Sequence, residues 1–105
     1  YTFAFPRINW LVTLSAWQPV GLAPVPAAEL VRRCQAAGVE VRHVWPCLPD
    51  LPLFRDSGGG AFPVARNVAK YGISLPCSPQ LTPKDQSIVI RTVNKILAEL
   101  KNSVV

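Results

Sequence analysis

Apolar residues recur at helical spacing in three separate stretches of the chain. The first runs from residue 27 to residue 37, directly after Pro26, and Gly38 supplies a stop signal at its end. The second is shorter, covers residues 62 to 71, and ends at Gly72. The third follows Thr82 and continues beyond residue 97. The pattern therefore predicts three helices.

The third helix has the clearest start signal. It is preceded by Thr82, whose hydroxyl can accept a hydrogen bond from a free backbone amide, and by Pro83, which fits a first turn. Asp85 suits the positive end of the helix dipole. Behind this start lies an apolar stripe that we expect to face the core, formed by Val89, Val93, Ile96, Leu97 and Leu100.

Other stretches have the composition or alternation of strands. Residues 9 to 16 are rich in residues that suit a pleated surface, and residues 39 to 45 alternate between apolar and polar. In the second stretch His43 and Trp45 are expected on the apolar face and Arg42 on the opposite face. Residues 73 to 75 read as a short extended segment. Two or three strands with about three helices predict an α+β sandwich, a small sheet covered by helices, in a single domain over residues 1–105.

Residues 46 to 60 contain prolines, aspartates and the run Ser57-Gly58-Gly59-Gly60, so they read as a loop after the second strand. The glycine run lacks the spacing and the lysine of phosphate-binding loops, and flexibility is its simpler explanation.

Composition narrows the class of protein. Half of the 105 residues are hydrophobic, which suits one compact domain. No apolar run is long enough to span a membrane, so we expect a soluble protein in the cytoplasm. Cys34, Cys47 and Cys77 are far apart and only one histidine is present, so we expect reduced thiols and no metal site. The net charge of +5 favours anionic partners such as nucleotide sugars, but the basic residues are too scattered to favour nucleic acid.

The order of short motifs resembles a known family. Residues 62 to 76, followed by Ser78-Pro79 and Leu81-Thr82, resemble the end of DegT/DnrJ/StrS-type sugar aminotransferases. Residues 38 to 45 resemble a strand of the family that carries Gly-Ile, Thr-Arg and Trp. Residues 51 to 54, Leu-Pro-Leu-Phe, resemble the Leu-Pro and aromatic residues that follow this strand in the family. The similarity extends from residue 9 to residue 101. It implies the carboxyl-terminal small domain of a fold type I enzyme that depends on pyridoxal phosphate.

Two departures from the family qualify this resemblance. Pro49 stands where the family commonly has a histidine, and proline can neither titrate nor donate a hydrogen bond. The large domain, which in the family provides the Schiff-base lysine and most cofactor contacts, has no counterpart in the sequence. The four lysines at positions 70, 84, 95 and 101 are expected on exposed helix surfaces. We therefore expect that this chain alone binds no cofactor, has no catalytic residue and is inactive.

Two hypotheses for function follow. In the first, the chain is a small domain that helps form the substrate pocket of a nucleotide-sugar aminotransferase. Arg42 would then bind an anionic group and Trp45 would stack on a sugar or base. A surface ion pair for Arg42 and a core position for Trp45 remain open. In the second, it is a stand-alone binding or interaction module derived from that domain. Its expected partners are the missing large domain or a second copy, because residues 46 to 54 and the amino-terminal segment are unusually apolar.

Overall fold

A three-stranded antiparallel sheet lies at the centre of the molecule. The computed structural model describes residues 11, 18–56 and 59–103. In these residues the strands are β1 (Val20–Leu22), β2 (Arg42–His43) and β3 (Gly72–Ser74), and their order in the sheet is β1-β3-β2. Both outer strands pair antiparallel with β3, and Ser74 stands opposite Val20 on one side and Arg42 on the other. The last strand in the chain is thus the central one.

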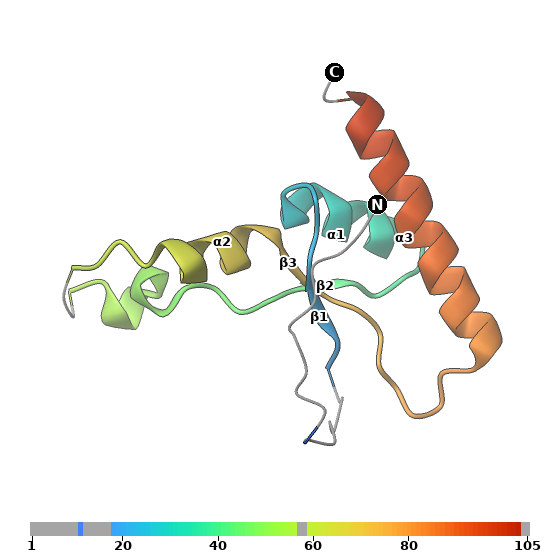
Figure 1. The fold of residues 1–105 in the computed structure, drawn as a ribbon, viewed down its shortest axis with the longest axis horizontal. Coiled ribbons are helices and arrows are strands. Elements are labelled where there is room, and N and C mark those ends of the chain that lie inside the picture. Colours follow the sequence, from blue (N-terminus) through green and yellow to red (C-terminus); the bar gives the residue numbers. More distant parts are fainter. Residues whose placement is uncertain (1–10, 12–17, 57–58, 104–105) are drawn as a thin grey trace.

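Three helices accompany the sheet: α1 (Ala27–Ala36), α2 (Pro63–Tyr71) and α3 (Pro83–Ser103). Helices α1 and α3 pack against each other, whereas α2 extends away from the opposite end of the sheet (Figure 1). The described part of the chain is therefore an α+β domain, as the sequence predicts. No helix in it combines the length and the apolar character needed to cross a bilayer.

One core joins the sheet to α1 and α3. Leu30, Ile73 and Leu97 are completely buried and come from α1, β3 and α3 respectively. The stripe predicted for α3 is confirmed, because four of its members are buried and Val89 packs against them. The full buried cluster contains Ala23, Ala27, Leu30, Val31, Cys34, Val39, Val41, Ile73, Val93, Ile96, Leu97 and Leu100.

The predicted helix signals act through specific hydrogen bonds. After α1, Gly38 has a φ of 80°, its N–H donates to the Gln35 carbonyl, and the Val39 N–H donates to the Cys34 carbonyl. This is a Schellman ending, in which a left-handed glycine and a buried residue after it stop the helix. Before α3, the Asp85 N–H donates to the Thr82 hydroxyl at 3.2 Å, and the Thr82 N–H donates to the Asp85 carboxylate at 3.0 Å. These reciprocal bonds form a capping box.

The strands were harder to predict than the helices. The strand expected at residues 9 to 16 lies outside the described residues, apart from Leu11. Strand β1 occupies residues 20 to 22, where the sequence pattern predicts no strand. A strand can form here because the four residues between Pro19 and Pro24 keep their backbone N–H groups, and because β1 lies at the edge of the sheet and pairs on one side only.

The second strand is shorter than expected, and its alternation breaks. Val39 and Val41 are buried as predicted, but only residues 42 and 43 pair with β3. The placement of His43 and Trp45 on the apolar face is wrong: both are exposed, Trp45 to 79%. The reason is that Val44, between these two residues, is the side chain that packs against the sheet. Its N–H donates to the Gly72 carbonyl at 3.3 Å, and its side chain lies against Gly72.

A projecting segment, which we call the arm, comprises residues 45–56 and 59–71. It contains two short 3-10 turns, Leu48–Asp50 and Pro52–Phe54, within the region predicted as a loop, and then α2. The arm is seen in Figure 1 as the green and yellow segment that leads away from the sheet. Neither turn, nor any part of α2, contains a buried residue.

Candidate functional site

A groove of about 240 Å³ opens beside Arg42, at the end of the sheet where the chain leaves β3. Arg42, the first residue of β2, and Glu40, two positions before it, are exposed, while Val41 between them is buried. The chain leaving β3 forms the opposite wall from Ser74 to Cys77, and Gln18 completes the lining. The orientation of Arg42 opposite to Val41 is thus as predicted.

The Arg42 guanidinium is held by its neighbour Glu40. Its Nε donates to Glu40 Oε1 at 2.9 Å, and its Nη2 donates to the same oxygen. This hydrogen bond raises the pKa of Arg42. Both side chains are about two-thirds exposed, and an ion pair in that environment contributes at most about 1 kcal/mol. An incoming anion can therefore displace Glu40 at small cost.

The groove suits a small anionic group. A guanidinium has five N–H donors in a planar fork, and the Nε and Nη2 groups of Arg42 each donate one hydrogen bond to Glu40. The remaining donors can form paired hydrogen bonds with a carboxylate or phosphate. The Gln18 amide, the Ser74 hydroxyl and the Cys77 thiol add uncharged polar groups to the lining. The arrangement is therefore suited to an anion, and Glu40 is the one carboxylate among the described residues that line the groove.

The structure does not bring the two predicted substrate residues together in this groove. Trp45 is not part of the lining, although its exposed ring remains available to a ligand or another surface. Glu40 was missed in the sequence, yet its spacing from Arg42 on one strand face was a usable signal. Ser74 and Cys77 were missed because only the strand order places them beside Arg42.

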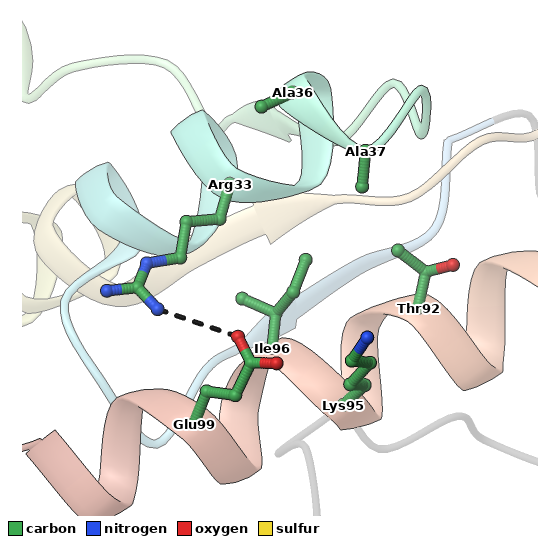
Figure 2. A pocket seen from close by; sticks show the side chains of 7 residues that line it. All are labelled: Arg33, Ala36, Ala37, Thr92, Lys95, Ile96 and Glu99. Carbon is green, nitrogen blue, oxygen red and sulfur yellow. Dashed lines mark ion pairs between the residues drawn. The ribbon is translucent and has the colours of Figure 1, made fainter.

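A larger groove, of about 410 Å³, lies between α1 and α3. Figure 2 shows Arg33 reaching across it toward Glu99, with Nη1 to Oε2 at 3.6 Å. Arg33 also donates to Glu29 at 2.8 Å, so two carboxylates already neutralise it. The floor contains Ile96 and small alanine side chains. We interpret this groove as the seam where α1 and α3 pack, because its lining mixes alanines and Ile96 with single polar and charged side chains and contains no group of several acids, bases or metal ligands.

Cysteines and possible metal ligands add no second site. Cys34 and Cys47 are buried and Cys77 is exposed, and all three are free thiols. Burial raises the pKa of Cys34, which keeps it in the unreactive thiol form. Across residues 11, 18–56 and 59–103, no group of three or more His, Cys, Asp or Glu side chains is placed to hold a metal ion.

Comparison with known proteins connects this domain to aminotransferases. Residues 7–94 match the model of the DegT/DnrJ/EryC1/StrS aminotransferase family. Among solved structures, the chain is similar to a putative sugar aminotransferase, Spr1654 from Streptococcus pneumoniae in its PMP form, with a TM-score of 0.71 and 17% identity. The match covers 78% of this chain and 22% of that chain. No curated protein matches in sequence.

Proposed function

The chain belongs to the DegT/DnrJ/EryC1/StrS aminotransferase family, and from this premise we propose that it supplies the small carboxyl-terminal domain of a pyridoxal-phosphate-dependent nucleotide-sugar aminotransferase. The observation that carries the proposal is the family match over residues 7–94 in a chain that spans only about a fifth of the solved aminotransferase it resembles. The proposal includes a cytoplasmic location, which suits three cysteines that remain thiols.

The proposed role is to form one wall of the substrate pocket. Arg42, exposed at the edge of the sheet, would bind a phosphate or carboxylate of the substrate in exchange for Glu40. Trp45 is three residues further along and its ring is largely free, so it would stack on the sugar or base. The groove walls formed by Ser74 to Cys77 would limit the size of the group that reaches Arg42.

The residues present do not fit pyridoxal phosphate itself. In the family this cofactor acts as the electron sink of transamination. A Schiff-base lysine needs an enclosed setting that lowers its pKa, whereas Lys70, Lys84 and Lys95 are exposed and none lines the Arg42 groove. Lys101 is also exposed, near the end of α3. We therefore propose that the chain orients substrate and that its catalytic lysine lies in another domain.

A second candidate is a stand-alone binding module derived from this domain. The observation that favours it is the core: twelve buried residues, most of them from α1, α3 and the sheet region, pack together within the described part of the chain. Such a core can support folding of the small domain alone. The module would keep the anion-binding groove and bind its ligand without transforming it.

Reading the gene upstream of Tyr1 separates the two candidates. A reading frame that continues into a large domain with a Schiff-base lysine supports the aminotransferase, and a start codon close to Tyr1 supports the stand-alone module.

Anion binding can be tested on the chain itself by NMR titration with a nucleoside diphosphate sugar. The amide signals of Glu40, Arg42 and residues 74 to 77 should shift together, and Arg42→Ala should abolish the effect. Glu40→Gln should tighten binding by up to about fivefold, because the competing carboxylate of a pair worth at most about 1 kcal/mol is removed. Shifts that persist in Arg42→Ala would contradict the assignment of this groove.

A further inference from the structure

One thiol of the chain lies in the Arg42 groove. Cys77 is exposed and lines the groove, whereas Cys34 and Cys47 are buried. It stands three residues after Ser74, the last residue of the central strand, so the sheet positions this segment beside Arg42. Solutes that enter the groove therefore meet one accessible thiol, while the two buried thiols are shielded from them.

A buried hydroxyl in the same groove also points to a ligand. Ser74 is only 5% exposed, yet it is part of the lining. Its side chain shares a face of the sheet with Arg42, because the two residues stand directly opposite each other in the antiparallel pairing of β3 with β2. Among the described residues, no group forms a hydrogen bond with the Ser74 hydroxyl. This hydroxyl can therefore donate to a group that enters the groove.

Arg42 supplies donors that favour an anionic group. Its Nε and Nη2 donate to Glu40, and its Nη1 has no hydrogen-bond partner within the described part of the chain. Both members of this pair are exposed, so the carboxylate of Glu40 is readily replaced by that of a ligand. Arg42 and Ser74 together can thus hold one carboxylate by charge-assisted hydrogen bonds.

The size of the groove limits what can be attached to Cys77. Its volume of about 240 Å³ is slightly below the roughly 300 Å³ at which pockets for small molecules usually begin. A group joined to the Cys77 sulfur must therefore be short. Its free end then stays in the volume that Arg42 and Ser74 also line.

We propose that Cys77 is a modification site for small disulfides that carry a carboxylate, which Arg42 and Ser74 bind while the sulfur reacts. The Cys77 thiolate attacks one sulfur of the ligand, the S–S bond of the ligand breaks, and a new S–S bond joins that sulfur to Cys77. The other half of the ligand leaves as a thiolate and takes up the proton that Cys77 released. Cys77 is oxidised, and the same two electrons reduce the ligand.

This modification would close the groove to other anions. The carboxylate attached to Cys77 would occupy the donors of Arg42 that a substrate phosphate needs. This consequence rests on the proposed function, because it requires that the groove binds a nucleotide sugar. The reaction of Cys77 with a disulfide does not require it, so the two can be tested separately.

Two probes of equal length and different charge test the proposal: dithiodipropionate, which carries carboxylates, and its neutral diamide. Each is mixed with the reduced 105-residue chain, and the rate of adduct formation at Cys77 is measured by mass spectrometry of proteolytic peptides. The ratio of the two rates reports the preference for charge, because a change in the reactivity of the thiol itself affects both probes and cancels.

The ratio should fall about three- to fivefold in Arg42→Gln, as expected for the loss of one exposed ionic contact. In Ser74→Ala it should fall at least about twofold, because a hydrogen bond to the carboxylate is lost. The matched control is Arg55→Gln, which removes the same charge from an exposed residue outside the groove and should leave the ratio unchanged. Circular dichroism should give the same helix content for Arg42→Gln, since Arg42 is exposed.

Three outcomes would overturn the proposal: a ratio unchanged in Arg42→Gln, an equal fall in Arg55→Gln, or faster labelling of Cys34 or Cys47 than of Cys77. If a nucleoside diphosphate sugar shifts the Arg42 amide signal while the ratio does not depend on Arg42, only the modification site fails. If the ratio depends on Arg42 but the sugar causes no shift, the modification site stands and the proposed function is contradicted. Sugar-induced shifts that persist in the Cys77 adduct would show that the modification does not close the groove.

Discussion

Replacing Gly72 by alanine is expected to destabilise the domain by about 2 to 4 kcal/mol, although Gly72 has an ordinary extended backbone with φ −73° and ψ 133°. The requirement is spatial. A Cβ atom at this position would lie 2.4 Å from the Val68 carbonyl oxygen and 2.5 Å from Cγ2 of Val44. Contacts this short force the backbone of α2 to move away from the sheet. Overpacking of this kind costs about 1 to 3 kcal/mol.

The hydrogen bond at the end of α2 adds to this cost. The Gly72 N–H donates to the same Val68 carbonyl oxygen that the new Cβ would meet. Loss of this bond contributes about 0.5 to 1.5 kcal/mol. For a domain of this size the total corresponds to a fall in Tm of about 10 to 25 °C, measurable by thermal unfolding followed by circular dichroism.

Two further variants separate the causes. Gly59→Ala is the matched control, because a Cβ there would meet nothing within 4 Å, and its Tm should stay the same or rise slightly. The double variant Gly72→Ala with Val44→Ala should recover only part of the loss, since the Val68 oxygen remains in place. A Gly72→Ala protein as stable as the Gly59→Ala control would refute the steric reasoning.

Two other predictions concern the helices. Thr82→Ala should lower the free energy of unfolding by about 1 kcal/mol in urea titrations, because it removes the hydroxyl that caps the Asp85 N–H, whereas Thr82→Ser should retain most of the stability. Stability should also fall as the pH is lowered from 4.5 toward 2: hydrogen bonds from Arg32 and Arg33 lower the pKa of Glu29 to about 2, and those from Thr82 lower the pKa of Asp85. Both carboxylates stabilise the fold when ionised, so their contribution is complete above their ordinary pKa and is lost on protonation. In Glu29→Gln this acid dependence should be shallower, and an unchanged profile would show that Glu29 has no part in it.

The sequence was most informative where the structure is governed by local signals. The helix beginning at Thr82, the helix ending at Gly38 and the apolar stripe of α3 depend on side chains within a few residues of one another, so all could be predicted. Strand β1 could not, because its three residues, which lie between two prolines, are stabilised only by their pairing with β3. The exposure of Trp45 could not be predicted for the same reason: Val44, and not Trp45, packs against Gly72, which belongs to a strand distant in the sequence.

The candidate site divides in the same way. Arg42 and its orientation followed from alternation along one strand, and Glu40 could have been found by the same rule. The other wall of the groove, from Ser74 to Cys77, could not be predicted, because it reaches Arg42 through the strand order. The exposed arm was partly foreseen, since residues 46 to 54 were expected on an apolar surface. The contribution of Phe62 and Val64 became visible only when α2 was found to contain no buried residue.

The position of β3 in the sheet also determines when the domain can form during synthesis. Val20 and Arg42 both pair with Ser74, so the first strand pairs with residues about 50 positions later, and β1 and β2 do not pair with each other in the folded sheet. Closing such long loops slows folding relative to a helical domain. A nascent chain that ends before residue 72 contains the two outer strands, β1 and β2, but lacks the central strand β3. The Arg42 groove, whose second wall follows β3, therefore cannot be completed before residues 74 to 77 have left the ribosome.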